Sequence, residues 1–367
     1  MPVWRVRNKP KPAAILRWTK PKNANTMKAL LLSDYLQLTY TDVPDPVAAD
    51  HEVIVRVKAC GICGSDVHGY DGSTGRRIPP LIMGHEASGV VVATGNDVQN
   101  WQVGDRVTFD STVYPLNDWY TLQGRYNLSD GREVLGVSPG AYRRHGAFAE
   151  FVAVPEHILY RLPDNVTFEQ AAMVEPVAVA LHALSIASPV LGESCFIAGA
   201  GMIGLSLVQV AAAAGLSPIV VADLLPERLK LAQTLGASHV LEHAGQHDAL
   251  IALTNGRGFD LAFEAVGISE TVHQAIENTR KGGRVVLVGN LQKNVYFPLQ
   301  QVVTREIAVL GSCAICGEYE TALNLISQGK VRVDPLISHI APLAEGAHWF
   351  EQLYRKTPGI NKVILTP

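Results

Sequence analysis

Residues 195–223 constrain the fold of this chain more than any other stretch. They read CFIAGAGMIGLSLVQVAAAAGLSPIVVAD, an apolar segment, a glycine turn, an Ala-rich segment and a second apolar segment ending at Asp223. Gly199, Gly201 and Gly204 match the pattern GxGxxG. In this setting the first glycine allows a tight turn, the second lets a pyrophosphate approach, and the third lets helix and strand pack closely. The stretch predicts a dinucleotide-binding βαβ unit, with the phosphates at the helix N-terminus.

Asp223 predicts which dinucleotide binds. A carboxylate at the end of the second strand accepts hydrogen bonds from both ribose hydroxyls of NAD and repels the 2′-phosphate of NADP. The alternative interpretation is a helix N-cap before Pro226. Strand and helix patterns continue to alternate to about residue 315, which predicts a parallel, doubly wound α/β sheet.

The rest of the chain follows a different pattern. Residues 27–181 contain short alternating segments bounded by Gly, Pro and Asp, which predict a barrel-like all-β unit. Within it, residues 111–145 are polar and aromatic with no clear period. Residues 316–367 read as two helices and a final strand, and we assign them back to the first domain because the nucleotide unit already has its strands. The dinucleotide domain, residues 182–315, is therefore expected to be inserted in the catalytic domain.

Four side chains form a candidate metal site. Cys63, the pair His85-Glu86 and the distant Glu175 supply the sulfur, imidazole and carboxylate ligands that zinc prefers. Three protein ligands with one open position are typical of a catalytic rather than a structural zinc. These ligands are far apart in sequence, so a folded domain has to bring them together, unlike a zinc finger.

Three other interpretations stay open on these residues alone. Cys63 is also compatible with an inert buried thiol, because free cysteine is among the most buried residue types. His85 and Glu86 are compatible with a structural pair beside a turn. Finally, Cys60-x-x-Cys63 and Cys313-x-x-Cys316 have the spacing of a four-cysteine zinc or redox site, which would leave His85 and Glu86 without a role.

Composition excludes several classes of function. The formal net charge of −3 gives no indication of a nucleic-acid surface. Five cysteines in 367 residues do not make a disulfide framework, so we expect a reducing, cytoplasmic location. The longest apolar stretch, residues 202–216, is too short to span a membrane. Residues 1–26 carry seven basic and no acidic side chains, and we expect a disordered tail there rather than a targeting signal.

These motifs together resemble the zinc-dependent medium-chain alcohol dehydrogenase family, and within it the sorbitol (L-iditol 2-) dehydrogenases. The resemblance covers roughly residues 27–367. It is carried by GICGSDVH (61–68), GHEASG (84–89), GRYNLS (124–129), LPDNVTFE (162–169), VEP (174–176), GAGMIG (199–204) and VLVG (286–289). It implies a GroES-like β-barrel catalytic domain with an inserted Rossmann domain, and a homodimer or homotetramer.

The resemblance also implies roles for individual residues. Cys63, His85 and Glu86 match the ligands of one catalytic zinc per chain, and Glu175 matches a glutamate that binds this zinc directly or through water. Ser65 and His68 match the groups that pass the proton outward. The matches to cofactor contacts are Gly199, Gly201, Ile203, Gly204, Asp223, Arg228, Val288, Gly289, Asn290, Ser312, Cys313 and Ala314. The implied activity is NAD-linked oxidation of a secondary alcohol of a polyol.

The chain departs from the family in two regions. The 111–130 segment contains no cysteine, so the second, structural zinc of many relatives is not expected. At the positions of an Arg-Tyr pair that grips polyols, this chain has Ala314 and Ile315, and the tyrosine after the relay histidine is replaced by Gly69, next to Tyr70. We therefore expect sugar alcohols or vicinal diols to be oxidised with modest selectivity.

Three alternatives accompany this prediction. L-Threonine is the alternative substrate, and it needs a cation such as Arg76 or Arg77, although a solvated loop charge is the expected role of both. A zinc-independent quinone or enone reductase needs no metal ligands, and the four ligands in this chain argue against it. A non-enzymatic nucleotide sensor keeps GAGMIG without needing the metal set.

Overall fold

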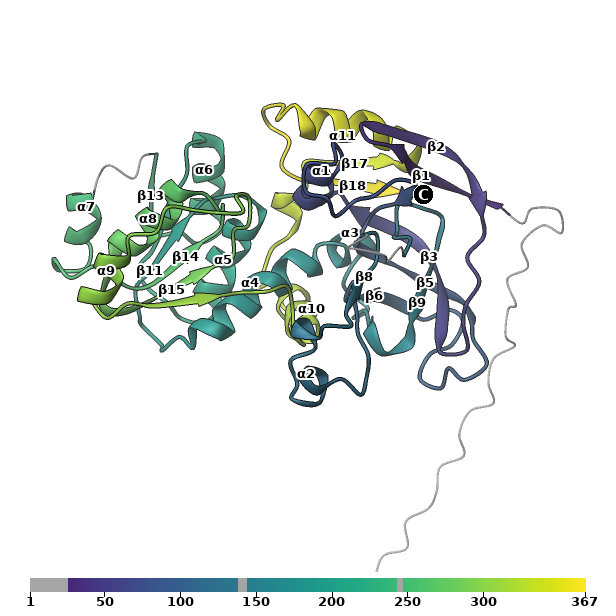
Figure 1. Cartoon of the computed structure of the whole chain (residues 1–367), viewed down its shortest axis with the longest axis horizontal. Helices are drawn as coiled ribbons and strands as arrows, with labels where there is room; N and C mark the ends of the chain where they lie inside the picture. The colour runs from purple at the N-terminus through teal and green to yellow at the C-terminus, as the bar shows by residue number, and fades with distance from the viewer. Residues whose placement is uncertain (1–25, 138–143, 243–246) are drawn as a thin grey trace, which may run out of the picture.

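Two parts of different architecture make up the molecule. The structure is a computed structural model, and it describes residues 26–137, 144–242 and 247–367. Figure 1 shows a parallel sheet with its helices on the left and a β-rich part on the right. The basic segment expected to be a tail lies almost wholly outside the described residues.

The β-rich part is built around one seven-stranded sheet. Its strands run in the order β10-β6-β5-β3-β18-β17, with β9 also paired to β3, beside a three-stranded sheet β2-β1-β4 and the pair β7-β8. The bounds are β1 (Thr26–Asp34), β2 (Gln37–Pro44), β3 (Glu52–Gly61), β4 (Leu81–Ile82), β5 (Glu86–Thr94), β6 (Arg106–Phe109), β7 (Thr112–Val113), β8 (Glu133–Val134), β9 (Phe151–Pro155), β10 (Leu159–Arg161), β17 (His339–Pro342) and β18 (Val363–Thr366).

The C-terminal strand returns to this first sheet. β18 pairs antiparallel with β3, so that Ile364 lies opposite Gly61 and Leu365 opposite Cys60. This pairing places β18 beside the C-terminal end of β3, shortly before Cys63 in the sequence.

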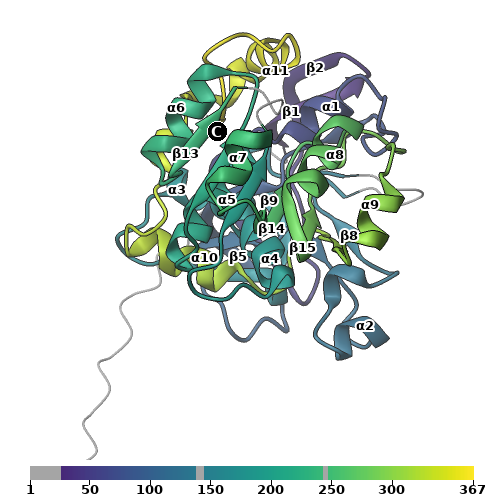
Figure 2. The same ribbon diagram turned by 90° about the vertical axis from the view of Figure 1, so that its left-hand side faces the viewer.

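The second sheet is parallel throughout and has the strand order β13-β12-β11-β14-β15-β16. Its strands are β11 (Cys195–Ala198), β12 (Ile219–Ala222), β13 (His239–Leu241), β14 (Phe259–Glu264), β15 (Thr279–Leu287) and β16 (Ala308–Gly311). This is the order of a dinucleotide-binding fold, in which the ligand lies where the strand order reverses, here between β11 and β14. The predicted fold class is confirmed, and Figure 2 shows the helices in front of this sheet.

Helices cover both faces of the parallel sheet because alternate strand residues point to opposite sides. Cys195 and Ile197 pack in one core cluster, while Phe196 and Ala198 pack in another on the opposite face. The α-helices are α1 (Gly64–Gly69), α2 (Trp119–Leu122), α3 (Phe168–Ala171), α4 (Val174–Ala187), α5 (Met202–Ala213), α6 (Pro226–Thr234), α7 (His247–Ala252), α8 (Ser269–Asn278), α9 (Leu299–Thr304), α10 (Tyr319–Ser327) and α11 (Gly346–Tyr354). Short 3-10 helices span Tyr126–Leu128, Glu156–Ile158, Asp334–Leu336 and Leu343–Glu345.

Helix α4 connects the two parts. The boundary expected between residues 181 and 182 falls within this continuous helix, and the domain limits stay a prediction. The longer helical stretch Phe168–Ala187, which ends with α4, passes the length and apolarity test for crossing a membrane, but 67% of its most apolar window is buried inside the protein. The apolar residues of α4 belong to the main core cluster, which is the ordinary environment of a core helix.

Candidate active site

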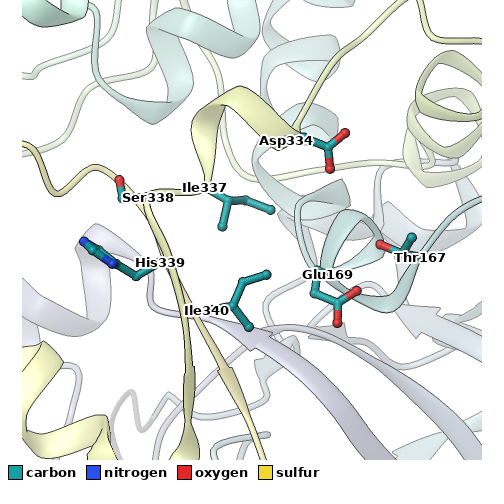
Figure 3. Close-up of a pocket in the computed structure, with 7 residues that line it drawn as sticks. All are labelled: Thr167, Glu169, Asp334, Ile337, Ser338, His339 and Ile340. Carbon is teal, nitrogen blue, oxygen red and sulfur yellow. The ribbon is translucent and has the colours of Figure 1, made fainter.

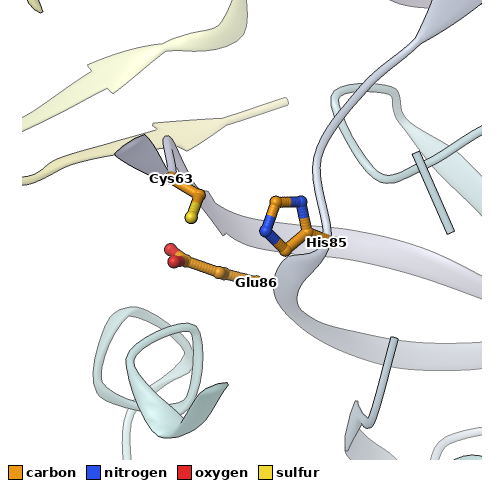
Figure 4. A group of neighbouring side chains, drawn as sticks. All are labelled: Cys63, His85 and Glu86. Carbon is orange, nitrogen blue, oxygen red and sulfur yellow. The ribbon is translucent and has the colours of Figure 1, made fainter. Parts of the chain in front are cut away.

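Cys63, His85 and Glu86 come together at the end of β3 and the start of β5. Cys63 is the N-cap residue of α1, and its Sγ accepts from the backbone N–H of Ser65 at 3.4 Å. His85 immediately precedes β5, and Glu86, its first residue, lies opposite Gly61 in the pairing of β5 with β3. One ligand atom from each of Cys63, His85 and Glu86 lies within 4.8 Å of the others, and the side chains point toward a common centre (Figure 4).

This group fits a zinc ion by its chemistry. It combines a thiol, an imidazole and a carboxylate, the donors of catalytic zinc sites. Burial lowers the pKa of His85, but the negative charges of Asp66 and Cys63 outweigh burial and raise it well above the ordinary value. The surroundings of the imidazole therefore favour a positive charge at this place, and a metal cation can supply it in place of the proton, because a histidine ligand is neutral.

Asp66 and Arg77 support the ligand group from behind, a role that was not expected of either residue from the sequence. Asp66 is completely buried, and its Oδ1 lies 3.4 Å from His85 Nδ1. Arg77 donates to the same oxygen through Nε at 3.1 Å and Nη2 at 2.8 Å. Burial raises the pKa of Asp66, but His85 and Arg77 outweigh it and hold that pKa at about 2. The expectation that Arg77 is a solvated loop charge is therefore wrong, because only 3% of it is exposed, whereas Arg76 is exposed.

Lys362 is a second buried cation that sequence reasoning missed. Its ammonium group donates to Glu86 Oε2 and to the carbonyl oxygen of Ile62, the latter at 3.2 Å, and only 2% of the residue is exposed. Burial lowers the pKa of Lys362, but Glu86 and Cys63 outweigh it and raise the net value above the ordinary one. Lys362 precedes β18, so the pairing of β18 with β3 brings this charge to the ligand group.

Ser65 and His68 both lie on α1 and are exposed. Ser65 Oγ donates to Cys63 Sγ at 3.2 Å and lies 3.5 Å from His85 Nε2, so it borders the ligand group. His68 lies three positions further along the same helix, which places it on the same side as Ser65. No hydrogen bond joins Ser65 to His68 within the described residues.

Glu175 is not part of the group in which the three ligand atoms meet. It lies in the first turn of α4. Burial and the negative charge of Glu86 raise the pKa of Glu175 to about 7. The electrostatic influence of Glu86 indicates that Glu175 faces the site, and its assignment as a ligand stays a prediction.

The glycine turn has the geometry expected of a dinucleotide site. Gly199 has φ +100°, a left-handed conformation that favours glycine. A Cβ on Gly204 would collide with the carbonyl oxygen of Gly199, so the bare Cα allows α5 to pack on β11. A Cβ on Gly201 would meet nothing within 4 Å, which leaves open space where a pyrophosphate would approach. These residues suit a bound dinucleotide.

Asp223 lies just after β12 and is tied to this turn. Its Oδ2 accepts from the backbone N–H of Ala200 at 2.7 Å, and its Oδ1 accepts from that of Leu225 at 2.9 Å. Arg228 Nη1 is 4.0 Å from the same carboxylate. Each carboxylate oxygen has a further lone pair, so these contacts leave acceptors for ribose hydroxyls.

The remaining predicted cofactor contacts gather at the same edge of the sheet. Val288, Gly289 and Asn290 follow the carboxyl end of β15, and Ser312, Cys313 and Ala314 follow that of β16. Ile203 lies in the first turn of α5. The Oγ of Ser312 is a buried polar atom with no partner among the described residues, which suits a group that receives its hydrogen bond from a ligand. Their contacts with NAD stay predictions.

Comparison with known proteins identifies the family. The family described as alcohol dehydrogenase GroES-like domain matches residues 49–164, and the one described as zinc-binding dehydrogenase matches residues 203–328. D-Xylulose reductase of Saccharomyces cerevisiae is 34% identical over 341 residues, which are 89% of this chain and 94% of the relative. The chain belongs to the zinc-dependent medium-chain alcohol dehydrogenase family. It is an oxidoreductase, and zinc and a nicotinamide dinucleotide are the cofactors of this family.

Two further similarities extend over nearly the whole dehydrogenase. Sorbitol dehydrogenase of Homo sapiens is 34% identical over 337 residues, which are 90% of this chain and 92% of the relative. The crystal structure of 2R,3R-butanediol dehydrogenase from Bacillus subtilis has a TM-score of 0.84 at 31% identity and covers 93% of this chain and 99% of that chain. The predicted family resemblance is confirmed.

The four-cysteine site considered from the sequence does not form in this dehydrogenase. Among the described residues, the group of Cys63, His85 and Glu86 is the one in which three or more such ligand atoms meet. Burial and the negative charges of Asp66 and Glu86 raise the pKa of Cys60 well above the ordinary value, so this thiol stays protonated. Cys316 Sγ instead donates to the carbonyl oxygen of Gly124 at 3.0 Å.

Cys313 belongs to a polar network that anchors the 111–130 lobe, which contains no cysteine. Asn127 donates to the carbonyl oxygen of Cys313 at 2.8 Å and lies 3.3 Å from His182 Nε2. His182 Nδ1 in turn lies 2.8 Å from Glu318 Oε1. Direct hydrogen bonds thus connect the lobe to the segment that carries predicted cofactor contacts.

A separate cavity of about 390 Å³ shares no lining residue with the ligand group or with the predicted cofactor contacts. It is lined by Thr167, Glu169, Asp334, Ile337, Ser338, His339 and Ile340 (Figure 3). None of these residues was predicted to bind substrate, zinc or cofactor.

Proposed function

We propose that the protein oxidises a secondary hydroxyl of a sugar alcohol or vicinal diol to a ketone, with NAD as hydride acceptor. The observation that carries this proposal is the convergence of Cys63, His85 and Glu86, a ligand set with one thiol and one carboxylate. A carboxylate ligand resembles the site of polyol enzymes more than that of ethanol-type enzymes. Support comes from the names of the relatives, which refer to a ketose, a sugar alcohol and a diol.

The chain's own residues supply distinct functions in this reaction. Cys63, His85 and Glu86 would hold the zinc, with Glu175 facing the same site. Bound zinc supplies a Lewis acid that makes a substrate hydroxyl easier to deprotonate near neutral pH. Ser65 borders the ligand group and accepts the released proton, and His68 on the same side of α1 passes it outward. Gly199, Gly201 and Gly204 let the dinucleotide bind at the N-terminus of α5, and the hydride chemistry belongs to the cofactor.

Substrate selectivity is expected to be modest. Ile315 is 2% exposed and packs in the main core, so it offers no donor to a distal hydroxyl. Tyr70 does not replace the missing tyrosine, because it is 5% exposed and its hydroxyl donates to the carbonyl oxygen of Leu36 at 2.7 Å. High selectivity, of about 10⁴ or more, needs buried polar partners for the substrate.

L-Threonine is less well supported than a polyol. Its carboxylate needs a cation, and Arg77 is already paired with Asp66. Initial rates of NAD reduction with sorbitol, xylitol, galactitol, 2,3-butanediol and L-threonine test the proposal. We expect at least two of the polyols or diols to be oxidised at comparable rates. Threonine faster than all of them by about tenfold, or no activity on any, would overturn the proposed substrate class.

We further propose that the protein is a homo-oligomer, a dimer or tetramer, located in the cytoplasm. β16 is an edge strand of the parallel sheet, and the preceding side chains Tyr296, Leu299 and Val303 are 73%, 64% and 65% exposed. An exposed apolar edge is favourable for pairing with a second copy. All five cysteines are free, which suits a reducing compartment. Light scattering should give a dimer or tetramer for the parent and a smaller species for Val303→Glu, whereas a parent that is monomeric at all concentrations contradicts the proposal.

A further inference from the structure

Arg77 reaches the ligand group in a way that the family resemblance does not imply. Its Nη2 donates to Ser65 Oγ at 3.0 Å, while Nε and Nη2 both donate to Asp66 Oδ1. The guanidinium group is therefore fixed by a buried carboxylate and directed at the exposed hydroxyl that borders the ligands. A planar guanidinium presents its N–H groups in a rigid fork, so its geometry is passed on to its partners.

The absent side chain at residue 69 is what makes room for this arginine. A Cβ on Gly69 would collide with Arg77 Cγ and lie 3.1 Å from Arg77 Cβ. Cβ and Cγ are at the base of the arginine side chain, so they cannot move aside without shifting the guanidinium. Gly69 stands where relatives were expected to carry a tyrosine, and any side chain at this position would meet Arg77.

We propose that Arg77 is a positioning residue that holds the Ser65 hydroxyl at the ligand group, and that Gly69 is required for it to reach. This inference rests on the proposed function, in which Ser65 accepts the proton from the substrate. An exposed serine hydroxyl has three staggered positions open to it. The donor from Arg77 occupies one lone pair of Ser65 Oγ and orients its O–H toward Cys63 Sγ, 3.2 Å away.

The positive charge of Arg77 also assists the reaction. To pass its own proton onward to His68, the Ser65 O–H has to turn away from Cys63 Sγ, and the serine oxygen then gains negative charge beside a fixed cation. Hydrogen bonds to ionised groups are roughly twice as strong as neutral ones. Arg77 therefore stabilises the serine oxygen at the moment of transfer, while its pairing with Asp66 holds the guanidinium group in place.

A double-mutant cycle tests whether Arg77 acts through Ser65. We expect kcat to fall about 100-fold or more in Ser65→Ala, as for the loss of a general-base step. Arg77→Met should lower kcat by about 10- to 100-fold with little change in KM, as for the loss of a charge-assisted hydrogen bond. The double variant should be no slower than Ser65→Ala alone, because the two changes remove one interaction. Independent, multiplicative effects would overturn the inference and assign Arg77 a role in supporting Asp66 alone.

Gly69→Ala is a second test of the same inference, and Arg76→Met is its control. Gly69→Ala should reproduce the fall in kcat of Arg77→Met, since the added methyl group displaces the arginine. Arg76→Met removes an exposed arginine one residue away and should leave kcat, KM and zinc content unchanged. If Arg77→Met does not fold because Asp66 is left uncompensated, Gly69→Ala and Arg77→Lys, which keeps the charge, take its place in the cycle. A fully active Gly69→Ala variant with one zinc per chain would contradict the proposal.

A spectroscopic readout needs no substrate. In the protein loaded with Co²⁺ instead of zinc, the charge-transfer band of the Cys63 thiolate reports the hydrogen bond from Ser65, since such outer contacts tune a metal site. Ser65→Ala and Arg77→Met should both move this band to longer wavelength, and the double variant should match Ser65→Ala. Unchanged spectra in Arg77→Met would overturn the inference. A parent that oxidises no alcohol overturns the proposed function instead, and the spectra then decide the inference.

Discussion

The two halves of the site are built in different ways. The nucleotide half is formed by backbone turns at the carboxyl ends of adjacent parallel strands, where glycines let chain and ligand approach. The metal half is formed by side chains, and buried charges hold them: Asp66 behind His85, and Lys362 behind Glu86. The strand order and the glycine turns therefore position the nucleotide half. The metal half depends in addition on the buried charges of Asp66 and Lys362. Substitutions in the metal half should accordingly be the more damaging.

The largest expected effect is that of Cys63→Ser. A serine hydroxyl is a poor zinc ligand compared with a thiolate. Elemental analysis should find one zinc per chain in the parent and almost none in the variant, and NAD-linked oxidation should fall by about 10³-fold or more. Binding of NADH, measured by fluorescence, should be nearly unchanged because the nucleotide half is separate. Two tightly bound zincs in the parent, or a variant with full zinc and full activity, would contradict this expectation.

Lys362→Met should show how far the metal half depends on countercharge. Removing one partner of a buried ion pair leaves the other uncompensated, at a cost of about 3–5 kcal/mol. In chelator-treated protein the free energy of unfolding should fall by that amount, whereas zinc should take over the compensation of Glu86 and reduce the loss. Urea unfolding with and without zinc measures both values.

The exposed Lys330 offers the matched control for this experiment. Lys330→Met should change the unfolding free energy by no more than about 0.5 kcal/mol in either form. An equal loss in zinc-loaded and chelated Lys362→Met would show that the lysine supports the fold without compensating a ligand.

The difference between the halves also explains what could be predicted from the sequence. GAGMIG is local: strand, turn and helix follow one another, so residues 195–223 predict both the fold and the site. That Cys63, His85 and Glu86 form a candidate ligand group was predictable because their residue types are those of a zinc site and their motifs resemble a known family. Lys362 was not, since it is 276 positions from Glu86 and becomes a partner only when β18 pairs with β3.

Arg77 shows a second limit of sequence reasoning. A loop arginine between glycines and prolines is normally solvated, because charged side chains are rarely buried unless they are paired. Its burial depends on Asp66 as a partner and on Gly69 for space, and neither relation follows a local period. The same holds for Glu175, whose distance from the ligand group depends on how α4 packs.

The pH dependence of stability should have opposite signs for two carboxylates, one in each part of the molecule. In the β-rich part, burial raises the pKa of Asp110 to about 6, although the Thr112 N–H and the Tyr126 hydroxyl donate to it. In the part built on the parallel sheet, burial also raises the pKa of Asp260, but Arg280 and Ser194 outweigh it and the net pKa lies below the ordinary value. The folded protein therefore favours the protonated form of Asp110 and the ionised form of Asp260.

The two signs give measurable consequences. The stabilisation from protonated Asp110 is present below about pH 4 and is lost as the pH rises through about 6. Relative to Asp110→Asn, the free energy of unfolding of the parent should therefore fall by about 3 kcal/mol between about pH 4 and pH 7. Relative to Asp260→Asn, the parent should instead lose stability as the pH falls below about 4. Urea unfolding of chelator-treated proteins across this range measures both differences. A constant difference between parent and Asp110→Asn would refute the assigned shift.

The smallest expected effect concerns Asp223, the side chain on which the cofactor preference of the nucleotide half depends. Its carboxylate accepts from the backbone N–H groups of Ala200 and Leu225, and it is expected to repel a 2′-phosphate. Asp223→Ser removes the repulsion and a hydrogen bond, together worth about 1.5–3 kcal/mol, so the NAD-to-NADP ratio of kcat/KM should fall by about 10- to 100-fold. Asp223→Asn removes the charge and keeps one of the two backbone hydrogen bonds, because its single amide oxygen can accept from only one of the two N–H groups. If charge sets the preference, Asp223→Asn should relax it while leaving the KM for NAD close to that of the parent.

A parent that uses NADP as well as NAD would show that the acid does not discriminate between the two cofactors. A relaxed preference in Asp223→Ser alone would assign the preference to the geometry of the glycine turn.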